Sequence, residues 1–254
     1  MMEEPRFSAD MYIRHYAAQR GITVEAIGVA PVVVLSWAPG VVRWMAEQVG
    51  AEFQPAWPWS KRRPFFTGTV GQQQVSFAQV GIGAPATVAE MEQMIACGAR
   101  TFITLGWAGS LQPSLPIGSL LIPNRCVTDD GTSPHYSLPG SGALVPDGGL
   151  VDILRDAAAS EGLPVQLGTQ WTTDAPYREL LGVISAHRAN GVLGVDMETA
   201  AMFALGQFRD VAVANLLVIS DEIWREWRSA ARTDMLRAAT RAAQRVVLCA
   251  LGQL

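Results

Sequence analysis

The chain has 254 residues, of which 49% are hydrophobic and 17% charged, and its formal net charge is −4. This length and composition suffice for one large core, and the slightly acidic balance excludes the basic footprint of a nucleic-acid-binding protein. We therefore expect a single domain over residues 1–254. The first residues lack the basic and apolar regions of a signal peptide, and no apolar run reaches membrane-spanning length, so we expect a cytoplasmic protein without a membrane partner.

Strand-like and helix-like patterns alternate along the first half of the chain. The β-branched run 31–35 predicts a buried strand that ends in a loop at 37–40, and residues 41–49 follow with a helical pattern. A Pro- and Trp-rich connection at 54–64 leads to two predicted strands at 65–70 and 75–80. A helix at 86–97 and a buried strand at 101–105 complete this half.

The second half continues the alternation. Residues 120–122 and 211–219 are apolar strand candidates, and 139–149 reads as a surface excursion rich in Gly and Pro. Helical patterns cover 150–160, 199–208 and 225–251. This order predicts an α/β fold. The three cysteines, Cys97, Cys126 and Cys249, lack metal-ligand spacing, and we interpret them as core thiols of a reducing compartment, with no metal site and no cofactor motif.

Two carboxylates lie where a strand-like run turns into a helix, in residues 194–203. Glu198 at this position is suited to accept hydrogen bonds from two neighbouring hydroxyls, such as those of a ribose. Alternatively, Asp196 and Glu198 sit in the first helical turn and offset the helix dipole. This segment alone leaves both interpretations open.

Seven segments, in this order and spacing, resemble the nucleoside phosphorylase family, which holds uridine phosphorylase, hexameric purine nucleoside phosphorylase and methylthioadenosine-type nucleosidases. The segments are Gly-Ile-Gly-Ala-Pro at 81–85, Leu-Gly-Trp-Ala-Gly-Ser-Leu-Gln-Pro at 105–113, Ile-Gly-Ser-Leu at 117–120, Asp-Gly-Thr-Ser-Pro-His-Tyr at 130–136, Thr-Thr-Asp at 172–174, Gly-Val-Leu-Gly-Val-Asp-Met-Glu at 191–198 and Ile-Ser-Asp at 219–221. The resemblance implies a single α/β domain with a central mixed β-sheet flanked by helices. It also implies cleavage of an N-glycosidic bond and assembly into a homodimer or a hexamer built as a trimer of dimers.

The same resemblance assigns candidate site residues. Asp221 matches the acid that protonates the leaving base, and its place after an apolar strand favours a desolvated acid that keeps a proton to donate; alternatively, it caps the following helix. Glu198 matches the residue that holds the ribose hydroxyls. The remaining substrate-binding candidates are Met197, Trp107, Ala108, Gly109, Thr173, Tyr177, Arg178 and His135.

Two of these further assignments, those of Arg178 and His135, have alternatives. Tyr177 would stack on the base and Arg178 would bind a base carbonyl or an anionic tail, although Arg178 would equally pair with Asp174 or Glu179. His135 would contact the terminal hydroxyl of the sugar, satisfy a turn, or supply a base together with Asp129 and Asp130.

The phosphate-binding positions depart from the family pattern. The first loop contains Trp37 and no Gly-Asp-Pro-x-x-Arg-like motif, and Thr104 and Trp107 stand where phosphorylases have an Arg and a Thr. Because a dianion needs several aligned donors, we expect the indoles of Trp37 and Trp107 to fill the old phosphate site, which slightly favours hydrolysis. The first loop also lacks the Glu with which the hydrolases of the family activate water.

Two alternative functions and the identity of the base remain open. A phosphorylase is one, with Arg43, or Arg62 or Arg63 of a neighbouring subunit, replacing the missing donors. A catalytically weak nucleoside-binding protein is another, although the presence of both Glu198 and Asp221 weighs against it. For the base, residues 191–198 look like the purine branch and favour a purine, whereas residues 130–136 look more like the uridine branch.

Overall fold

The computed structural model describes residues 5–137 and 142–254, so part of the predicted excursion at 139–149 lies outside the described residues. Ten strands form one mixed sheet in the order β10-β9-β6-β7-β8-β5-β1-β4-β3-β2. The strands are β1 (Val32–Ser36), β2 (Glu52–Phe53), β3 (Phe65–Val70), β4 (Gln73–Gln79), β5 (Thr101–Ser110), β6 (Leu120–Asp129), β7 (Val165–Thr173), β8 (Gly194–Asp196), β9 (Ala212–Glu222) and β10 (Arg228–Ser229). This arrangement confirms the predicted α/β fold with a mixed sheet.

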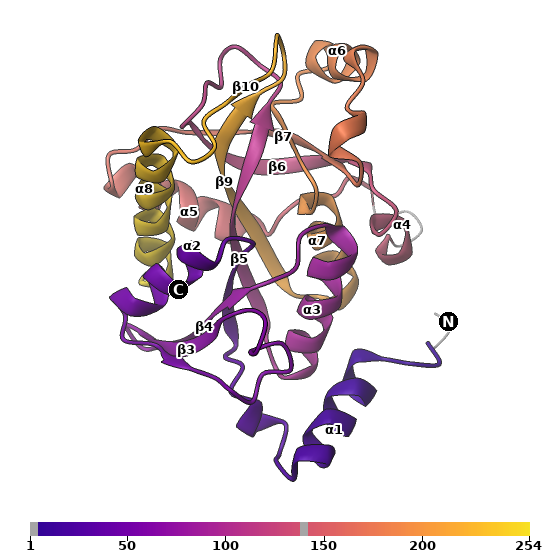
Figure 1. Ribbon diagram of the computed structural model, residues 1–254, viewed down its shortest axis with the longest axis vertical. Helices are drawn as coiled ribbons and strands as arrows, with labels where there is room; N and C mark the ends of the chain where they lie inside the picture. The colour runs from indigo at the N-terminus through magenta and orange to yellow at the C-terminus, as the bar shows by residue number, and fades with distance from the viewer. Residues whose placement is uncertain (1–4, 138–141) are drawn as a thin grey trace.

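Helices cover both faces of the sheet (Figure 1). The α-helices are α1 (Ala9–Arg20), α2 (Pro39–Gln48), α3 (Ala84–Ala96), α4 (Ser133–Tyr136), α5 (Gly148–Ser160), α6 (Leu181–Ala189), α7 (Thr199–Arg209) and α8 (Asp234–Leu251), with short 3₁₀ turns η1 (Glu25–Ile27) and η2 (Pro176–Arg178). Buried apolar residues of α2, α5 and α8 form one core with one face of the sheet. Those of α1, α3 and α7 form a second core on the other face.

Five strands, β5 to β9, pair in a closed ring, and the candidate site lies at one edge of this ring. β5 pairs with β9 and β8, β8 with β7, β7 with β6, and β6 again with β9. At the closing edge, Gly109 of β5 pairs with Val195 of β8 and with Asp221 of β9. A Cβ at Gly109 would lie 3.2 Å from Val195 Cγ1 and 3.5 Å from Asp221 Oδ2, so a residue without a side chain suits this position.

One helix prediction is wrong at its start. The helical pattern predicted a helix over 225–251, but α8 begins at Asp234, where the N-cap hydroxyl of Thr233 accepts a hydrogen bond from Leu236 N–H at 3.3 Å. The preceding residues instead turn back as β10 and pair antiparallel with β9. Arg232 has a φ of 64°, in the left-handed region, which a continuing α-helix does not allow.

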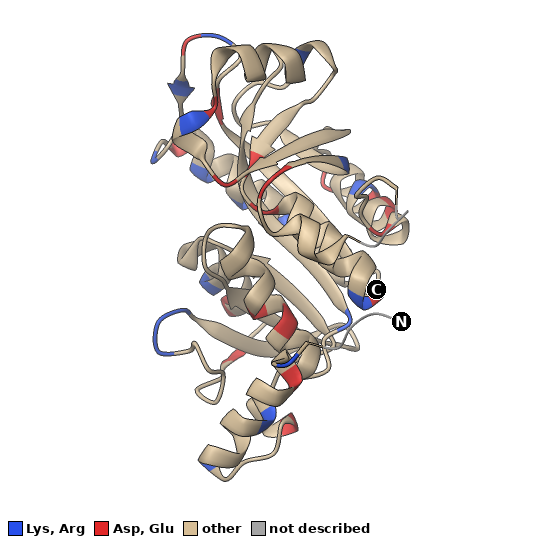
Figure 2. Ribbon diagram, turned by 90° about the vertical axis from the view of Figure 1, so that its right-hand side faces the viewer, with Lys and Arg blue, Asp and Glu red and all other residues tan. Residues whose placement is uncertain are grey.

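Other elements exceed the prediction. The elements α1, β2, α4, α6, β7 and β10 had no predicted counterpart, and β5 and β6 continue well beyond the predicted runs 101–105 and 120–122. The second halves of β5 and β6 contain polar and glycine residues, so their sequences do not show an apolar strand pattern. Pairing with neighbouring strands holds these residues in the sheet despite their low strand propensity. Within the described residues, none of the helices is long and apolar enough to cross a membrane. Figure 2 shows acidic and basic segments interspersed along the molecule rather than gathered by sign.

Candidate active site

A cavity of about 540 Å³ lies at the closing edge of the five paired strands. We call it the base cavity. Residues from the ends of β5, β8 and β9, from the η2 turn and from the segment after β9 line it: Trp107, Ala108, Gly109, Pro176, Tyr177, Glu179, Val195, Asp196, Met197, Ser220, Asp221, Ile223 and Trp227. Ligands of α/β sheets bind at the carboxyl ends of strands, and the volume is typical of a small-molecule site. Predicted site residues from three strands therefore meet here.

Asp221 lies in β9 and faces this cavity. Its Oδ1 accepts a hydrogen bond from the hydroxyl of Ser220 at 2.7 Å, and its Oδ2 accepts one from the indole N–H of Trp227 at 3.2 Å. Asp221 also pairs with Ser229 of β10, so it does not cap a helix as one interpretation had it. The side chain of Asp221 is only partly buried, because the strand ends at the cavity rather than inside the core. The strong desolvation of this carboxyl that the apolar strand predicted is therefore absent.

Glu198 is buried, 7% exposed, between the end of β8 and the start of α7. Its Oε1 accepts a hydrogen bond from Gly83 N–H at 2.7 Å, and its Oε2 accepts one from Met197 N–H at 3.3 Å. Burial, followed by the nearby charge of Asp196, raises the pKa of Glu198 to about 8. Glu198 is not among the residues that line the base cavity, whereas its neighbour Met197 is.

Asp196 holds the start of α7. Its Oδ1 accepts hydrogen bonds from the Thr172 hydroxyl at 2.8 Å and from Thr199 N–H at 3.3 Å, and its Oδ2 accepts one from the Thr199 hydroxyl. Burial raises the pKa of Asp196. The helix-start role that the sequence left open for both carboxylates thus belongs to Asp196, whereas Glu198 reaches across to Gly83.

The residues predicted around the base, Thr173, Tyr177 and Arg178, lie only partly at the cavity. Tyr177 lines it but is 98% exposed, so in this structure the ring lies at the rim. Arg178 is exposed, and among the described residues it forms no ion pair with Asp174 or with Glu179. Thr173 is buried, and its hydroxyl accepts a hydrogen bond from Ala175 N–H at 3.3 Å, so it shapes the turn that leads to η2.

Sequence reasoning missed several lining residues as site residues, and two of them, Glu179 and Trp227, bear on Asp221. Glu179 is half-buried in the base cavity, and burial together with the charge of Asp221 raises its pKa to about 7. It had been considered only as a partner of Arg178. Trp227 had been placed inside the predicted helix, and no sequence signal links it to Asp221, because the contact depends on β10 pairing with β9.

His135 lies apart from the base cavity. It is exposed on α4, and neither His135 nor Asp129 lines the cavity. Asp130 is occupied in shaping the turn before α4: its Oδ1 accepts hydrogen bonds from Thr132 N–H at 2.9 Å and Ser133 N–H at 2.7 Å. Within this chain, these three residues are therefore not placed to act as a base on a water molecule in the base cavity.

The three altered phosphate positions point in different directions. Trp37 packs on the backbone of β5: a Cβ at Gly106 would lie 2.6 Å from a carbon of its ring, and its indole N–H donates to the Thr87 hydroxyl at 2.9 Å. Trp107 faces α8 and donates to the Thr240 hydroxyl at 3.1 Å. Successive residues of a strand point to opposite faces, so the expectation that both indoles fill one site is wrong.

Thr104 is the third of these positions. It is fully buried in β5, and its hydroxyl has no hydrogen-bond partner among the described residues. It offers no charge to an anion. The part of the chain that the structure describes also holds no cluster of three His, Cys, Asp or Glu side chains suited to a metal ion.

A mixed α/β sheet with a small-molecule cavity at its strand ends defines the general class. The chain belongs to the phosphorylase superfamily, whose family model matches residues 31–251. It is 34% identical over 169 residues to a uridine phosphorylase of Treponema pallidum, covering 62% of this chain and 65% of that protein, slightly less than two thirds of its length. It is 29% identical over 161 residues to a DeoD-type purine nucleoside phosphorylase of Bacillus cereus, covering 63% and 68% of the two chains.

Solved structures share the fold. A purine nucleoside phosphorylase from Toxoplasma gondii in complex with immucillin-H superposes with a TM-score of 0.81 at 22% identity, covering 91% of this chain and 93% of that one. A uridine phosphorylase from Vibrio fischeri superposes with a TM-score of 0.79 at 22% identity, covering 90% and 95%. The family and the fold class expected from the sequence are thus confirmed.

Proposed function

We propose that this chain cleaves the N-glycosidic bond of a nucleoside, with a purine favoured as the base and water as the nucleophile. Membership of the phosphorylase superfamily and the base cavity with Asp221 support the bond that is cleaved. The observation that carries the choice of water is the indole of Trp37 lying on Gly106, beside a Thr104 that has no charge to offer. No cofactor is required.

The proposed chemistry uses two carboxyl groups. The carboxyl of Asp221 delivers a proton to a base nitrogen while the bond from that base to the sugar breaks, so the base leaves as a neutral molecule with the bonding electron pair. Water adds to the electron-poor sugar carbon, and the proton that it loses returns to Asp221 through solvent. The Ser220 hydroxyl and the Trp227 indole, which donate to Asp221, hold the carboxyl in place.

Glu198 is proposed to accept the ribose hydroxyls. Each carboxylate oxygen has two lone pairs, so the backbone N–H bonds from Gly83 and Met197 leave acceptor capacity for a diol. Hydroxyl donors stabilise the ionised form, and a bound ribose would therefore lower the pKa of Glu198 from its value of about 8.

Phosphorolysis is the second candidate, and the names of the relatives favour it: the similar proteins from Treponema pallidum and Bacillus cereus are phosphorylases. One of the arginines considered as a replacement donor is already engaged, because Arg63 Nη2 lies 2.8 Å from Oε1 of the buried Glu90. Arg43 and Arg62 are exposed and remain available for this role.

The deciding experiment measures base release from purine and pyrimidine nucleosides with and without phosphate, and identifies the sugar product. Free ribose formed equally without phosphate supports the proposal, and phosphate-dependent ribose 1-phosphate contradicts it. Asp221→Asn should lower the rate of base release by about 100-fold or more. Glu198→Gln should strongly impair a ribonucleoside and much less a 2′-deoxynucleoside, with Asp156→Asn, an exposed acid on α5 outside the cavity, as control. Ligand binding without any release would favour a binding protein.

We also propose a homodimer or a trimer of dimers. Large apolar side chains lie exposed on this chain, among them Ile82 at 68% and Leu181 at 79%. A contiguous exposed apolar patch marks an interaction site in a soluble protein, and the proposed interface would cover these side chains. Size-exclusion chromatography with light scattering tests the assembly, and a monomer at micromolar concentration would contradict it.

A further inference from the structure

Glu90 is a buried acid that the proposed chemistry leaves without a role. It lies on α3 and is 3% exposed, and burial raises the pKa of its carboxyl. It does not line the base cavity. A buried carboxyl costs free energy unless other groups bind it, so the contacts of Glu90 indicate what it does.

Two groups bind the same oxygen of Glu90. Its Oε1 accepts a hydrogen bond from Gly81 N–H at 3.0 Å and lies 2.8 Å from Nη2 of Arg63. The guanidinium carbon of Arg63 lies 5.3 Å from the ring centroid of Trp59, and the Trp59 indole N–H donates to the side chain of Gln93 on α3 at 2.9 Å. Arg63 is thus fixed against α3, and it holds the carboxylate that receives Gly81 N–H.

The loop between β4 and α3 is bound at Gly81 from two sides. The hydroxyl of Thr87 donates to the Gly81 carbonyl oxygen at 3.0 Å, so Glu90 and Thr87, which are one helical turn apart, bind the N–H and the C=O of one residue. A Cβ at Gly81 would lie 2.9 Å from Cβ of Ala86, so a residue without a side chain suits this close approach. α3 therefore fixes this end of the loop.

The other end of the same loop contacts the proposed sugar-binding residue. Gly83 N–H donates to Oε1 of Glu198 at 2.7 Å. Gly83 has a φ of 93°, in the left-handed region that favours glycine. Ile82, between the two glycines, is 68% exposed, so its side chain does not anchor the loop in this chain. The direction of Gly83 N–H therefore depends on how Gly81 is held.

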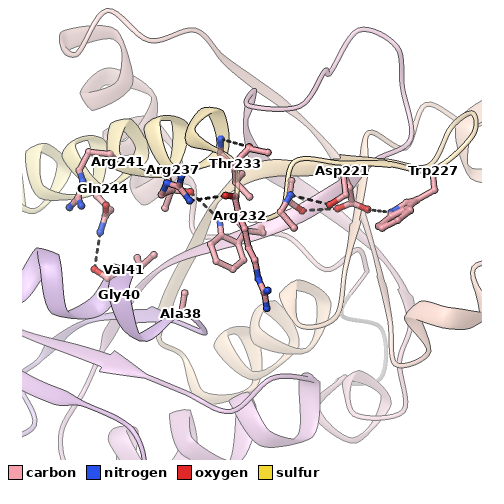
Figure 3. A pocket seen from close by; sticks show the side chains of 16 residues that line it. Ala38, Gly40, Val41, Asp221, Trp227, Arg232, Thr233, Arg237, Arg241 and Gln244 are labelled. Atoms are coloured by element: carbon pink, nitrogen blue, oxygen red, sulfur yellow. Dashed lines mark hydrogen bonds between the residues drawn. The ribbon is translucent and has the colours of Figure 1, made fainter.

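Trp37 supports the same loop from the end of β1. Its indole N–H donates to the hydroxyl of Thr87 at 2.9 Å. The helix that follows Trp37 is itself held by α8, because the buried Gln244 side chain donates to the Val41 carbonyl oxygen at 2.9 Å (Figure 3). Thr87 and Glu90 thus bind Gly81 from a firmly supported part of the core.

We propose that Glu90, held by Arg63, is a positioning residue: through the loop from Gly81 to Gly83, it fixes the N–H that orients Glu198 toward the ribose hydroxyls. The inference rests on the proposed function, in which Glu198 accepts those hydroxyls. A hydrogen bond from N–H to a carboxylate is charge-assisted and directional, so it selects one orientation of Oε1 and leaves lone pairs free for the diol.

A purely structural ion pair between Glu90 and Arg63 is the competing interpretation. Loss of a structural contact lowers the activity toward every substrate alike. Loss of a positioning contact acts on the substrate that needs a correctly oriented Glu198, which is the ribonucleoside with both hydroxyls. The ratio of the rates for a ribonucleoside and its 2′-deoxy analogue therefore separates the two interpretations.

The test measures kcat/KM for base release from adenosine and 2′-deoxyadenosine, in phosphate buffer so that either nucleophile can attack. Glu90→Ala removes the acceptor of Gly81 N–H and should lower the value about tenfold for adenosine and less than about threefold for 2′-deoxyadenosine. Glu90→Gln keeps an oxygen that accepts this N–H and should retain most of the activity. Glu92→Ala is the matched control, because Glu92 lies on the same helix but pairs with Arg209 at 2.7 Å.

A double variant tests whether Glu90 acts through Glu198. In a Glu198→Ala background the proposed target is gone, so Glu90→Ala should lower the remaining adenosine activity by less than about twofold. Equal losses for the two nucleosides, or the full tenfold loss in the Glu198→Ala background, would overturn the proposal and leave Glu90 as a structural ion pair.

Arg63→Gln provides the test if Glu90→Ala does not fold. It leaves the acceptor in place and removes the cation that holds it, so we expect a loss of about threefold for adenosine with little change for 2′-deoxyadenosine. An unchanged ratio of the two rates would equally overturn the proposal. A wild-type protein that releases no base from either nucleoside would remove the proposed function itself, whereas release with a ratio that none of these variants changes removes only the role of Glu90.

Discussion

Replacing Glu198 with Gln removes a titrating group from a buried position and keeps a side chain of nearly the same shape. Burial and the charge of Asp196 raise the pKa of Glu198 from 4.5 to about 8, so the folded protein keeps this proton over a pH range in which the unfolded chain has released it. We expect the wild-type protein to lose stability as the pH rises across that range, and the Glu198→Gln variant to lose much less.

The sign and size of this effect follow from linkage. The folded pKa is above the unfolded one, so the contribution is fully present below pH 4.5 and is lost as the pH rises through about 8. At about 1.4 kcal/mol for each pKa unit, the complete effect is ~5 kcal/mol. Asp196 titrates together with Glu198 and shares that energy. We therefore expect the free energies of unfolding of wild type and variant to diverge by at least ~2 kcal/mol between pH 5 and pH 9.

The assay is urea unfolding at one-unit pH intervals from 5 to 9, followed by tryptophan fluorescence. Glu47→Gln provides the same substitution at an exposed position of α2 and should run parallel to wild type. Parallel curves for wild type and Glu198→Gln would refute the reasoning, because they would mean that Glu198 titrates alike in the folded and unfolded chains.

Three further predictions concern the candidate site, two of them at the base cavity and one at the contact of Trp37 with Gly106. Trp227→Phe removes the N–H that donates to Asp221 and should lower kcat for base release by about tenfold with KM little changed. Gly106→Ala places a methyl group 2.6 Å from the ring of Trp37 and should cost about 1–3 kcal/mol of stability in urea unfolding. Glu179, whose pKa is raised to about 7, should bind hypoxanthine less well as the pH rises through 7, because an ionised carboxyl no longer donates; Glu179→Gln should remove this trend in calorimetry.

Each of these has a contrary outcome. A Trp227→Phe enzyme whose KM alone changes would assign the indole to substrate binding. Gly182→Ala, on α6 with open space around the glycine, is the control for Gly106→Ala, and equal stabilities of the two variants would mean that Trp37 gives way freely. A pH trend for hypoxanthine that survives Glu179→Gln would exclude Glu179 as its source.

Local sequence patterns predicted a large part of the fold. The β-branched run before Trp37 and the apolar run before Asp221 are strands, and the helical pattern after Glu198 is α7. Apolar periodicity is a property of consecutive residues, so it can be recognised in the sequence without knowledge of the tertiary structure. The pattern failed at 225–233, where pairing of β10 with β9 overrides a helical sequence.

The sequence by itself determined the family, the alternation of strands and helices, and the positions of Glu198 and Asp221. Only the tertiary structure decided what these residues contact: Glu198 accepts from Gly83, 115 residues away, and Trp107 donates to Thr240, 133 residues away. It also separated Trp37 from Trp107 and brought Arg232 and Asp221 to the lining of one cavity. Such contacts depend on how the strands close and on which face each side chain leaves, and spacing along the chain does not encode either.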